Sequence, residues 1–218
     1  METSDSESSE NSSHFLTIKS LVKTEIKIKN SRFITFAVPV KNKKECQIIL
    51  SKYQKLYHDA SHVCYAYRFG VGDRQLFRYS DAGEPAGTAG APIYKVIEGA
   101  DITDLIVLVV RYFGGIKLGV GGLIRAYTEA AKEVLQTARI VKKEIKETVH
   151  FEIMYDILNK ILHEISVFDI KIIEQNYSDQ IEFIVAAPIN KVLKFKESLT
   201  NISSGSVKFI SESKKSHS

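Results

Sequence analysis

Glycine and arginine are confined to one part of this chain, and their confinement limits how the chain can fold. Eleven of the twelve glycines lie between Gly70 and Gly122, and all seven arginines precede Val141. Residues 141–218 contain lysine but no arginine, and a single glycine, Gly205. Glycine permits tight turns and close backbone contacts. A glycine-rich part followed by a glycine-poor part therefore indicates two separately built domains, for which 218 residues are sufficient.

We expect the two domains to meet near residue 140. The expected organisation is a disordered, acidic, serine-rich tail (1–17), a first domain (18–140), a second domain (141–211) and a polar tail (212–218). The first tail has too few apolar residues to form a core. It also lacks the basic and apolar stretches of a signal peptide, so we expect no targeting role. Any other role of this tail is left open.

The net charge of +4 is unevenly distributed. Residues 1–20 sum to −3, residues 21–140 to +7 (18 basic and 11 acidic side chains), and residues 141–218 to zero. The basic first domain is typical of a protein that attracts phosphate groups. The two cysteines, Cys46 and Cys64, are too few for a disulfide framework or a four-cysteine zinc site. No apolar run reaches about 18 residues, so we expect no membrane contact. So few cysteines fit a reducing compartment, and we expect a cytoplasmic protein. We also expect no metal or cofactor.

Apolar periodicity predicts the elements of the first domain. Residues 105–110 are apolar on both faces, which predicts a strand buried on both sides. Between His62 and Phe69, aromatic residues alternate with smaller and polar ones, as in a strand with two different faces. Further strands are expected at 24–29 and at 34–38, the latter ended by Pro39, with helices at 46–57 after the capping residue Asn42 and at 123–139 after a glycine loop.

The second half has its own pattern. Its apolar spacing predicts, in order, a strand (145–153), a helix (156–165), two strands (168–174 and 181–187), a helix (190–199) and a strand (207–210). The order β-α-β-β-α-β is that of the ferredoxin-like, split βαβ motif. The expected fold class is therefore α+β in two domains.

Two glycine-rich segments carry the clearest chemical signal. The first is residues 78–90, RYSDAGEPAGTAG, and the second is residues 110–122, VRYFGGIKLGVGG. The second segment leads from the buried strand into a helix, where backbone N–H groups can bind an anion. Lys117 and Arg125 would add positive charge. Neither nucleotide-binding glycine pattern is present, and tight turns explain the glycines equally well.

Other candidate chemistry is weaker. His62 and Cys64 share one strand face, which suits a nucleophile with its base or part of a metal site, but a buried structural cysteine is favoured. Asp81 and Glu84 are paired acids that could transfer protons or bind a cation. Acids in glycine- and proline-rich turns more often accept backbone hydrogen bonds, and we favour that interpretation. No catalytic residue is identified.

Two segments resemble the signature of the YigZ/Impact family: residues 79–92 (YSDAGEPAGTAGAP) and residues 110–127 (VRYFGGIKLGVGGLIRAY). Residues 29–34 (KNSRFI) and 62–67 (HVCYAY) are also similar to family positions, so that the resemblance spans about residues 18–140. The second half resembles the small domain of bacterial YigZ-type members. The resemblance implies a first domain with a βαβ-rich fold, like that of a ribosomal-protein domain and of domain IV of elongation factor G. It implies a ferredoxin-like second domain, similar to domain V of that factor.

For function, the resemblance implies a translation-linked protein without an accepted enzymatic activity. The leading hypothesis is a regulator that binds RNA or the ribosome. The alternatives are an enzyme that acts on a phosphorylated small molecule at the glycine-rich loop, and a regulator of translation that acts through a protein partner. The oligomeric state is left open. The candidate ligand- or RNA-binding residues are Arg68, Arg78, Tyr79, Asp81, Glu84, Arg111, Tyr112, Gly114, Gly115, Lys117, Gly119, Gly121, Gly122 and Arg125.

Overall fold

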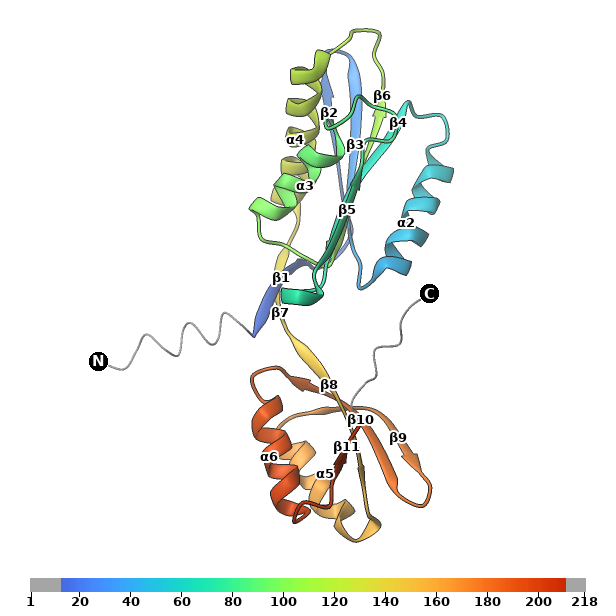
Figure 1. Ribbon diagram of the computed structural model, residues 1–218. Coiled ribbons are helices and arrows are strands. Elements are labelled where there is room, and N and C mark those ends of the chain that lie inside the picture. The colour runs from blue at the N-terminus through green and yellow to red at the C-terminus, as the bar shows by residue number, and fades with distance from the viewer. Residues whose placement is uncertain (1–12, 211–218) are drawn as a thin grey trace, which may run out of the picture. The chain divides into compact units, whose positions relative to one another are not determined.

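The computed structural model describes residues 13–210, which divide into two compact α+β units, one of residues 15–143 and one of the other described residues (Figure 1). Most of the two expected tails (1–12 and 212–218) lies outside the described residues. Residues 14–17, which we expected in the first tail, instead belong to strand β1 (His14–Ile18). This strand pairs with β7 (Ile140–Glu144), and Ile18, the last residue of β1, is fully buried.

The first unit is built on a five-stranded antiparallel sheet with strand order β2-β3-β6-β4-β5. The central strand, β6, is fully buried from residue 105 to residue 110, as its apolar run predicts. The elements are β2 (Val22–Ile28), β3 (Ser31–Pro39), α2 (Lys43–Leu56), β4 (His62–Phe69), a short 3-10 helix η1 (Gly72–Arg74), β5 (Leu76–Ser80), α3 (Gly90–Gly99), β6 (Leu105–Tyr112) and α4 (Gly119–Thr137).

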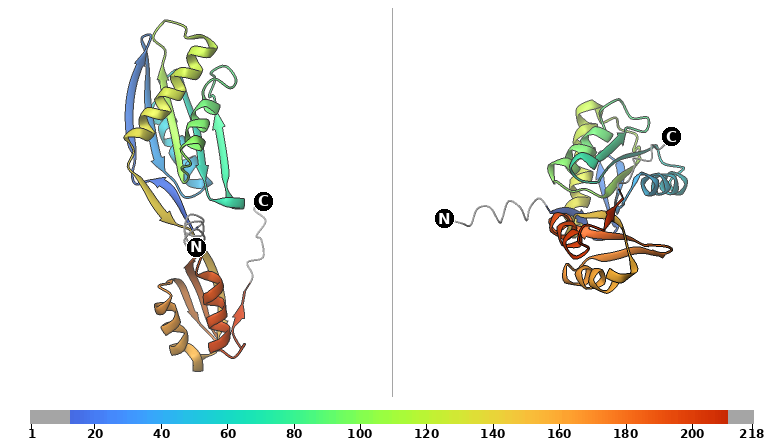
Figure 2. Two further views of the ribbon diagram at one scale, coloured as in Figure 1. Left: turned by 90° about the vertical axis from the view of Figure 1, so that its left-hand side faces the viewer. Right: turned by 60° about the horizontal axis from the view of Figure 1, so that its bottom comes forward.

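Helices cover both faces of this sheet. The two helices α3 and α4 lie side by side on one face, and α2 lies on the other (Figures 1 and 2). The alternation of β4 divides its side chains between the two apolar cores: Cys64 and Ala66 face α3 and α4, whereas Tyr65 and Tyr67 face α2. The two-faced strand predicted from the sequence is therefore confirmed.

The two predicted helix starts have different outcomes. Asn42 caps α2 as predicted, because its Oδ1 accepts a hydrogen bond from the backbone N–H of Glu45 at 2.9 Å. The expected glycine loop before α4 is only partly correct: Gly114 and Gly115 lie in it, but Gly119, Gly121 and Gly122 lie in the first turn of that helix. Glycine is a poor helix former, but the buried apolar face of α4 stabilises the helix through tertiary packing.

The second unit has the predicted element order β-α-β-β-α-β. Its antiparallel sheet has the order β11-β8-β10-β9, and one face packs on the two helices through a core that includes Phe151, Phe183 and Phe195. The elements are β8 (Lys146–Ile153), a short 3-10 helix η2 (Tyr155–Ile157), α5 (Leu158–Val167), β9 (Lys171–Tyr177), β10 (Ile181–Pro188), α6 (Val192–Ile202) and β11 (Lys208–Phe209). Across residues 13–210, no helix is long and apolar enough to cross a bilayer.

Both cysteines are expected to be unreactive in the folded protein. Burial raises the pKa of Cys46 and of Cys64 to about 12, so neither thiol ionises near neutral pH. A thiol-reactive chromogenic disulfide at pH 8 should therefore release almost no colour from native protein and two equivalents in 6 M guanidinium chloride. A Ser51→Cys variant, whose added thiol lies on an exposed position of α2, is the positive control. Fast native labelling of the wild-type chain would contradict the assigned burial.

Candidate functional site

The register of the sheet sets the position of Arg111 near the end of β6. This residue lies opposite Phe33 of β3 on one side and opposite His62 of β4 on the other. The Arg111 Cζ atom is 5.5 Å from the centre of the Phe33 ring, within the range of a cation–π contact. Three strands that are far apart in the sequence thus meet around one arginine.

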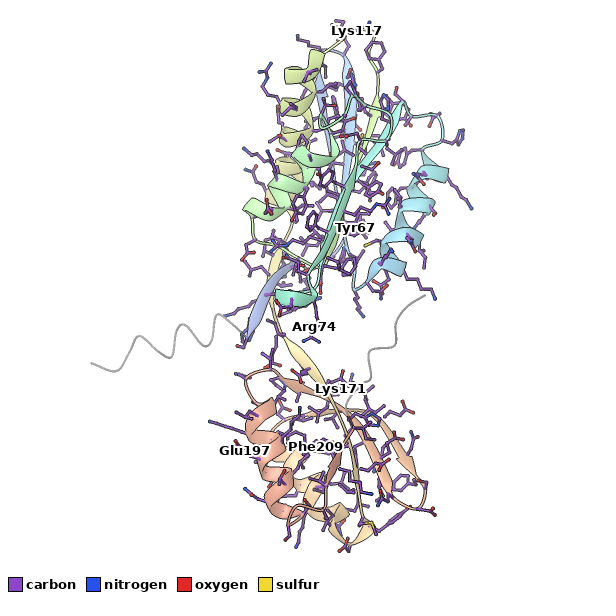
Figure 3. All side chains as sticks on the ribbon, viewed as in Figure 1. Tyr67, Arg74, Lys117, Lys171, Glu197 and Phe209 are labelled. Atoms are coloured by element: carbon purple, nitrogen blue, oxygen red, sulfur yellow. The ribbon has the colours of Figure 1, made fainter. Side chains whose placement is uncertain are left out.

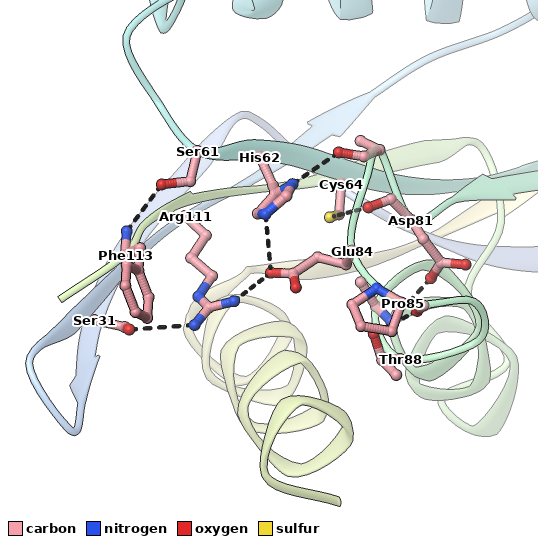
Figure 4. Close-up of polar contacts among 12 residues, drawn as sticks. Ser31, Ser61, His62, Cys64, Asp81, Glu84, Pro85, Thr88, Arg111 and Phe113 are labelled. Carbon is pink, nitrogen blue, oxygen red and sulfur yellow. Dashed lines mark hydrogen bonds and ion pairs between the residues drawn. The ribbon is translucent and has the colours of Figure 1, made fainter. Parts of the chain in front are cut away.

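The partner of this arginine comes from the loop between β5 and α3. Arg111 Nη1 donates a hydrogen bond to Glu84 Oε1 at 2.5 Å, as Figure 4 shows. Both residues are buried, with 5% of Arg111 and 8% of Glu84 exposed. The other terminal nitrogen, Nη2, donates to Ser31 Oγ at 3.4 Å. A buried charge is unfavourable unless it is paired and hydrogen-bonded, and each of these two charges stabilises the other.

Two further side chains contact the same carboxylate. Tyr127 of α4 donates its hydroxyl to Glu84 Oε1 at 2.8 Å, and burial raises the pKa of this phenol far above its usual range, so it stays protonated. His62 Nε2 lies 3.8 Å from the same oxygen. Because a carbonyl oxygen only accepts, His62 Nδ1 donates to Ala82 O, 2.9 Å away. Glu84 therefore connects β6, β4 and α4.

Asp81 organises the loop that carries Glu84. Its two carboxylate oxygens accept backbone hydrogen bonds from Gly87, Ala89 and Gly90 at 2.8–2.9 Å. Burial raises the pKa of Asp81, but these three N–H groups outweigh it and leave the pKa below its ordinary value. Two of the donors lie at the start of α3. Asp81 thus has the turn-forming role that its glycine- and proline-rich surroundings favour.

Two glycines allow the loops to approach the sheet. A Cβ atom on Gly90 would lie 2.7 Å from the backbone nitrogen of Ser80 in β5. A Cβ atom on Gly114 would collide with the backbone of Asn30, in the turn before β3. The Gly114 N–H also donates to Ser31 Oγ, the hydroxyl that Arg111 contacts. Any side chain at these two positions would push the loops away from the buried ion pair.

The arrangement supports a rigid scaffold better than a reactive centre. The Cys64 thiol lies 2.9 Å from Asp81 O, which can only accept its hydrogen bond, and its raised pKa keeps it protonated. This thiol therefore does not form an activated nucleophile with His62. Within residues 13–210, no group of three His, Cys, Asp or Glu side chains is placed to hold a metal ion.

The candidate residues predicted from the sequence fall in different places. Glu84 and Arg111 meet as described, and their burial does not fit the direct RNA or phosphate contact that we expected of them. Arg68 lies six residues along β4 from His62, about 20 Å away, and forms a 3.2 Å ion pair with Asp101. The structure thus separates Arg68 from the ion pair that the other two residues form.

Several of the remaining candidates are exposed on the first unit. Arg78 and Tyr79 lie on the outermost strand, β5, and the half-exposed Tyr79 ring stacks near Tyr94 of α3, with ring centres 5.9 Å apart. Figure 3 places Lys117 at the outer end of the loop between β6 and α4. Arg125 is exposed on the second turn of α4. These side chains are available to a ligand.

The other candidates have local roles or follow the loop. The Tyr112 hydroxyl donates to Asp59 at 2.8 Å. Gly114 and Gly115 form the start of the loop after β6, and Gly115 has a positive φ of 85°. Gly119, Gly121 and Gly122 belong to the first turn of α4, so any anion bound there would meet a helix N-terminus rather than a loop.

Sequence reasoning missed Tyr127 and Ser31 as members of the network. A signal for Tyr127 was present, because its position falls on the apolar face of the predicted helix and a buried phenol needs a hydrogen-bond partner. Ser31 gave no such signal, since its hydroxyl contacts residues about 80 positions away.

Removing Glu84 should strongly destabilise the first unit. Glu84→Ala leaves the buried guanidinium of Arg111 without its counter-charge, and we expect a loss of about 3–5 kcal/mol in the free energy of unfolding. The double variant Glu84→Leu/Arg111→Met removes both charges and should recover part of this loss. Urea unfolding, followed by circular dichroism, measures both effects.

The exposed pair Arg32–Glu25 provides a matched control. Its side chains are 44% and 40% exposed and 3.8 Å apart, so Glu25→Ala should change the free energy of unfolding by less than about 1 kcal/mol. Equal effects of Glu84→Ala and Glu25→Ala would contradict the assigned role of the buried pair.

Asp81 should contribute to stability in a pH-dependent way. Its pKa is lowered in the folded state, so its contribution is present at neutral pH and is lost as the pH falls through the folded pKa. We expect Asp81→Asn to lose about 1–2 kcal/mol at pH 7 and to approach wild-type stability as the pH falls from 7 through the folded pKa of Asp81. Urea unfolding across this pH range tests this, and a difference that does not depend on pH would contradict it.

Comparisons with known proteins cover both halves of the chain. Residues 29–135 match the Impact N-terminal domain, and residues 151–206 match a domain of unknown function, DUF1949. The sequence is 35% identical to IMPACT family member YvyE of Bacillus subtilis over 191 residues, 88% of each chain. It is 33% identical to IMPACT family member YigZ of Escherichia coli over 184 residues, 84% of this chain and 90% of that one. A crystal structure of a hypothetical protein superposes with a TM-score of 0.75 at 31% identity, covering 93% of this chain and 99% of the other.

Proposed function

We propose, from the premise that this chain belongs to the IMPACT family, that it is a translation-linked regulator which binds RNA or the ribosome through its first unit. The observation that carries the proposal is the separation of charge along the sequence. Residues 21–140 hold a net charge of +7, whereas residues 141–218 are neutral. Lysine and arginine on the surface of one domain attract the phosphate backbone of RNA without regard to its sequence.

The exposed residues around the glycine-rich segments are the proposed contacts. Arg78, Lys117 and Arg125 would meet phosphates, and the half-exposed rings of Tyr79 and Phe113 would stack on unpaired bases. In this proposal Arg111 acts indirectly. Its ion pair with Glu84 fixes the loop before α3 against the end of β6, and Gly114, two residues after the end of β6, shares the Ser31 hydroxyl with Arg111. The exposed contacts would therefore be presented by preorganised backbone.

The proposed relationship to elongation factor G supports the same function. We propose that the first unit shares the fold of domain IV of that factor and that the second unit shares the fold of domain V. Both domains of the factor contact the ribosome. Because unrelated functions can occur on one fold, this relationship adds to the argument from charge and does not replace it.

Reversing charge at the exposed contacts should weaken RNA binding. We expect Lys117→Glu/Arg125→Glu to reduce the affinity for a fluorescent structured RNA at least tenfold at low salt, because two phosphate contacts are replaced by repulsion. The logarithm of the association constant decreases linearly with the logarithm of the salt concentration, and the magnitude of this slope should be smaller by about 0.7–0.9 for each lost contact. Fluorescence polarisation between 50 and 300 mM KCl measures both quantities.

The second unit supplies a control with the same change of charge. Lys171→Glu/Lys194→Glu alters two exposed lysines outside the basic region and should leave the affinity almost unchanged. Absence of RNA and ribosome binding by the wild-type chain would overturn the proposal. So would binding that does not respond to salt, or equal losses in the two double variants.

A further inference from the structure

A groove lies between α3 and α4, because residues of both helices line it. Its volume is about 790 Å³, and all of its lining residues belong to the first unit. The walls are helical rows spaced four residues apart: Ala91, Lys95 and Gly99 on α3, and Ile124, Thr128, Lys132 and Gln136 on α4. Such rows form the ridges between which a further helix can pack.

The groove exposes apolar surface. Leu16, Ile124 and Ile140 line it, and each is 39% exposed despite its large apolar side chain. Val120, one turn before Ile124 on α4, is 61% exposed and extends the apolar stripe beyond the groove. On the opposite wall, Ala91 and Gly99 have little or no side chain, so a helix could approach the α3 backbone closely. Exposed apolar patches of this kind mark interaction sites.

The charge of the groove is of one sign. Among its lining residues, Lys95 and Lys132 are the only charged side chains, and they stand on opposite walls. An apolar floor between two lysines complements a helix that has an apolar face with acidic residues on both flanks. A helix three turns long would match α3, which has ten residues and is about 15 Å long.

We propose that this groove is the docking site for an acidic amphipathic α-helix of a partner protein. The inference goes beyond RNA binding and does not depend on it, because the groove shares none of Arg78, Lys117 and Arg125. A segment of this chain fits less well, since residues 1–12 are acidic but have only Met1 as an apolar side chain. A second copy placed groove to groove would bring four lysines together.

Site-specific photo-crosslinking in cells tests this proposal. The full-length chain carries p-benzoylphenylalanine in place of Thr128, in the groove, or in place of Lys52 on α2, which covers the opposite face of the sheet. Mass spectrometry then identifies the crosslinked segment. We expect only position 128 to yield a segment of another protein that has apolar residues every three to four positions and Asp or Glu beside them.

Binding of that segment as a synthetic peptide provides the second measurement. Lys95→Glu/Lys132→Glu should weaken the peptide's affinity for the full chain at least tenfold, and Lys43→Glu/Lys44→Glu on α2 should leave it unchanged. Circular dichroism should show that both variants remain folded. The proposal is overturned by crosslinks to residues 1–12 or to a second copy, by the absence of any crosslink, by a segment without this pattern, or by equal affinities of the two variants.

Discussion

The buried ion pair between Glu84 and Arg111 is the interaction on which the geometry of the first unit depends. Removing either charge leaves the other without its partner in an environment that does not solvate it. The loop after β5 and the end of β6 must therefore come together whenever the unit folds. Tyr127 adds α4 to the same point through its hydrogen bond to Glu84. One carboxylate thus joins the sheet to the helix layer.

This constraint explains why the glycine-rich segments are built as they are. The loop that holds Glu84 must turn sharply, and Asp81 supports it by accepting three backbone hydrogen bonds near the start of α3. The close approaches at Gly90 and Gly114 leave no room for a Cβ atom. These glycines and the two acids therefore serve the shape of the domain, whereas the basic residues Arg78, Lys117 and Arg125 around them are exposed. The proposed RNA contacts and the groove between α3 and α4 use different residues of this rigid framework.

Much of the fold could be predicted from local pattern. Strands β3 and β4 and helix α2 were recognisable because the residue types along them repeat with the period of the element, and because Asn42 is a good cap for α2. Strand β6 was recognisable because its run of residues is apolar on both faces. Strand β5 was missed because all but one of its residues are exposed and its sequence does not alternate clearly. Helix α3 was missed because it follows a run of glycine and alanine, and its N-terminus is organised by Asp81 from outside the helix.

The candidate site was only partly predictable for a related reason. The sequence by itself determined the separation of basic charge, the family resemblance and the two segments in which Glu84 and Arg111 occur. Only the tertiary structure decided that these two residues pair, since they are 27 positions apart and meet through the register of β6 with its neighbours. That register buries Arg111, whereas Lys117 lies exposed in the loop that follows β6. A residue's type states which charge it carries, but strand pairing and packing decide whether a partner side chain or solvent stabilises that charge.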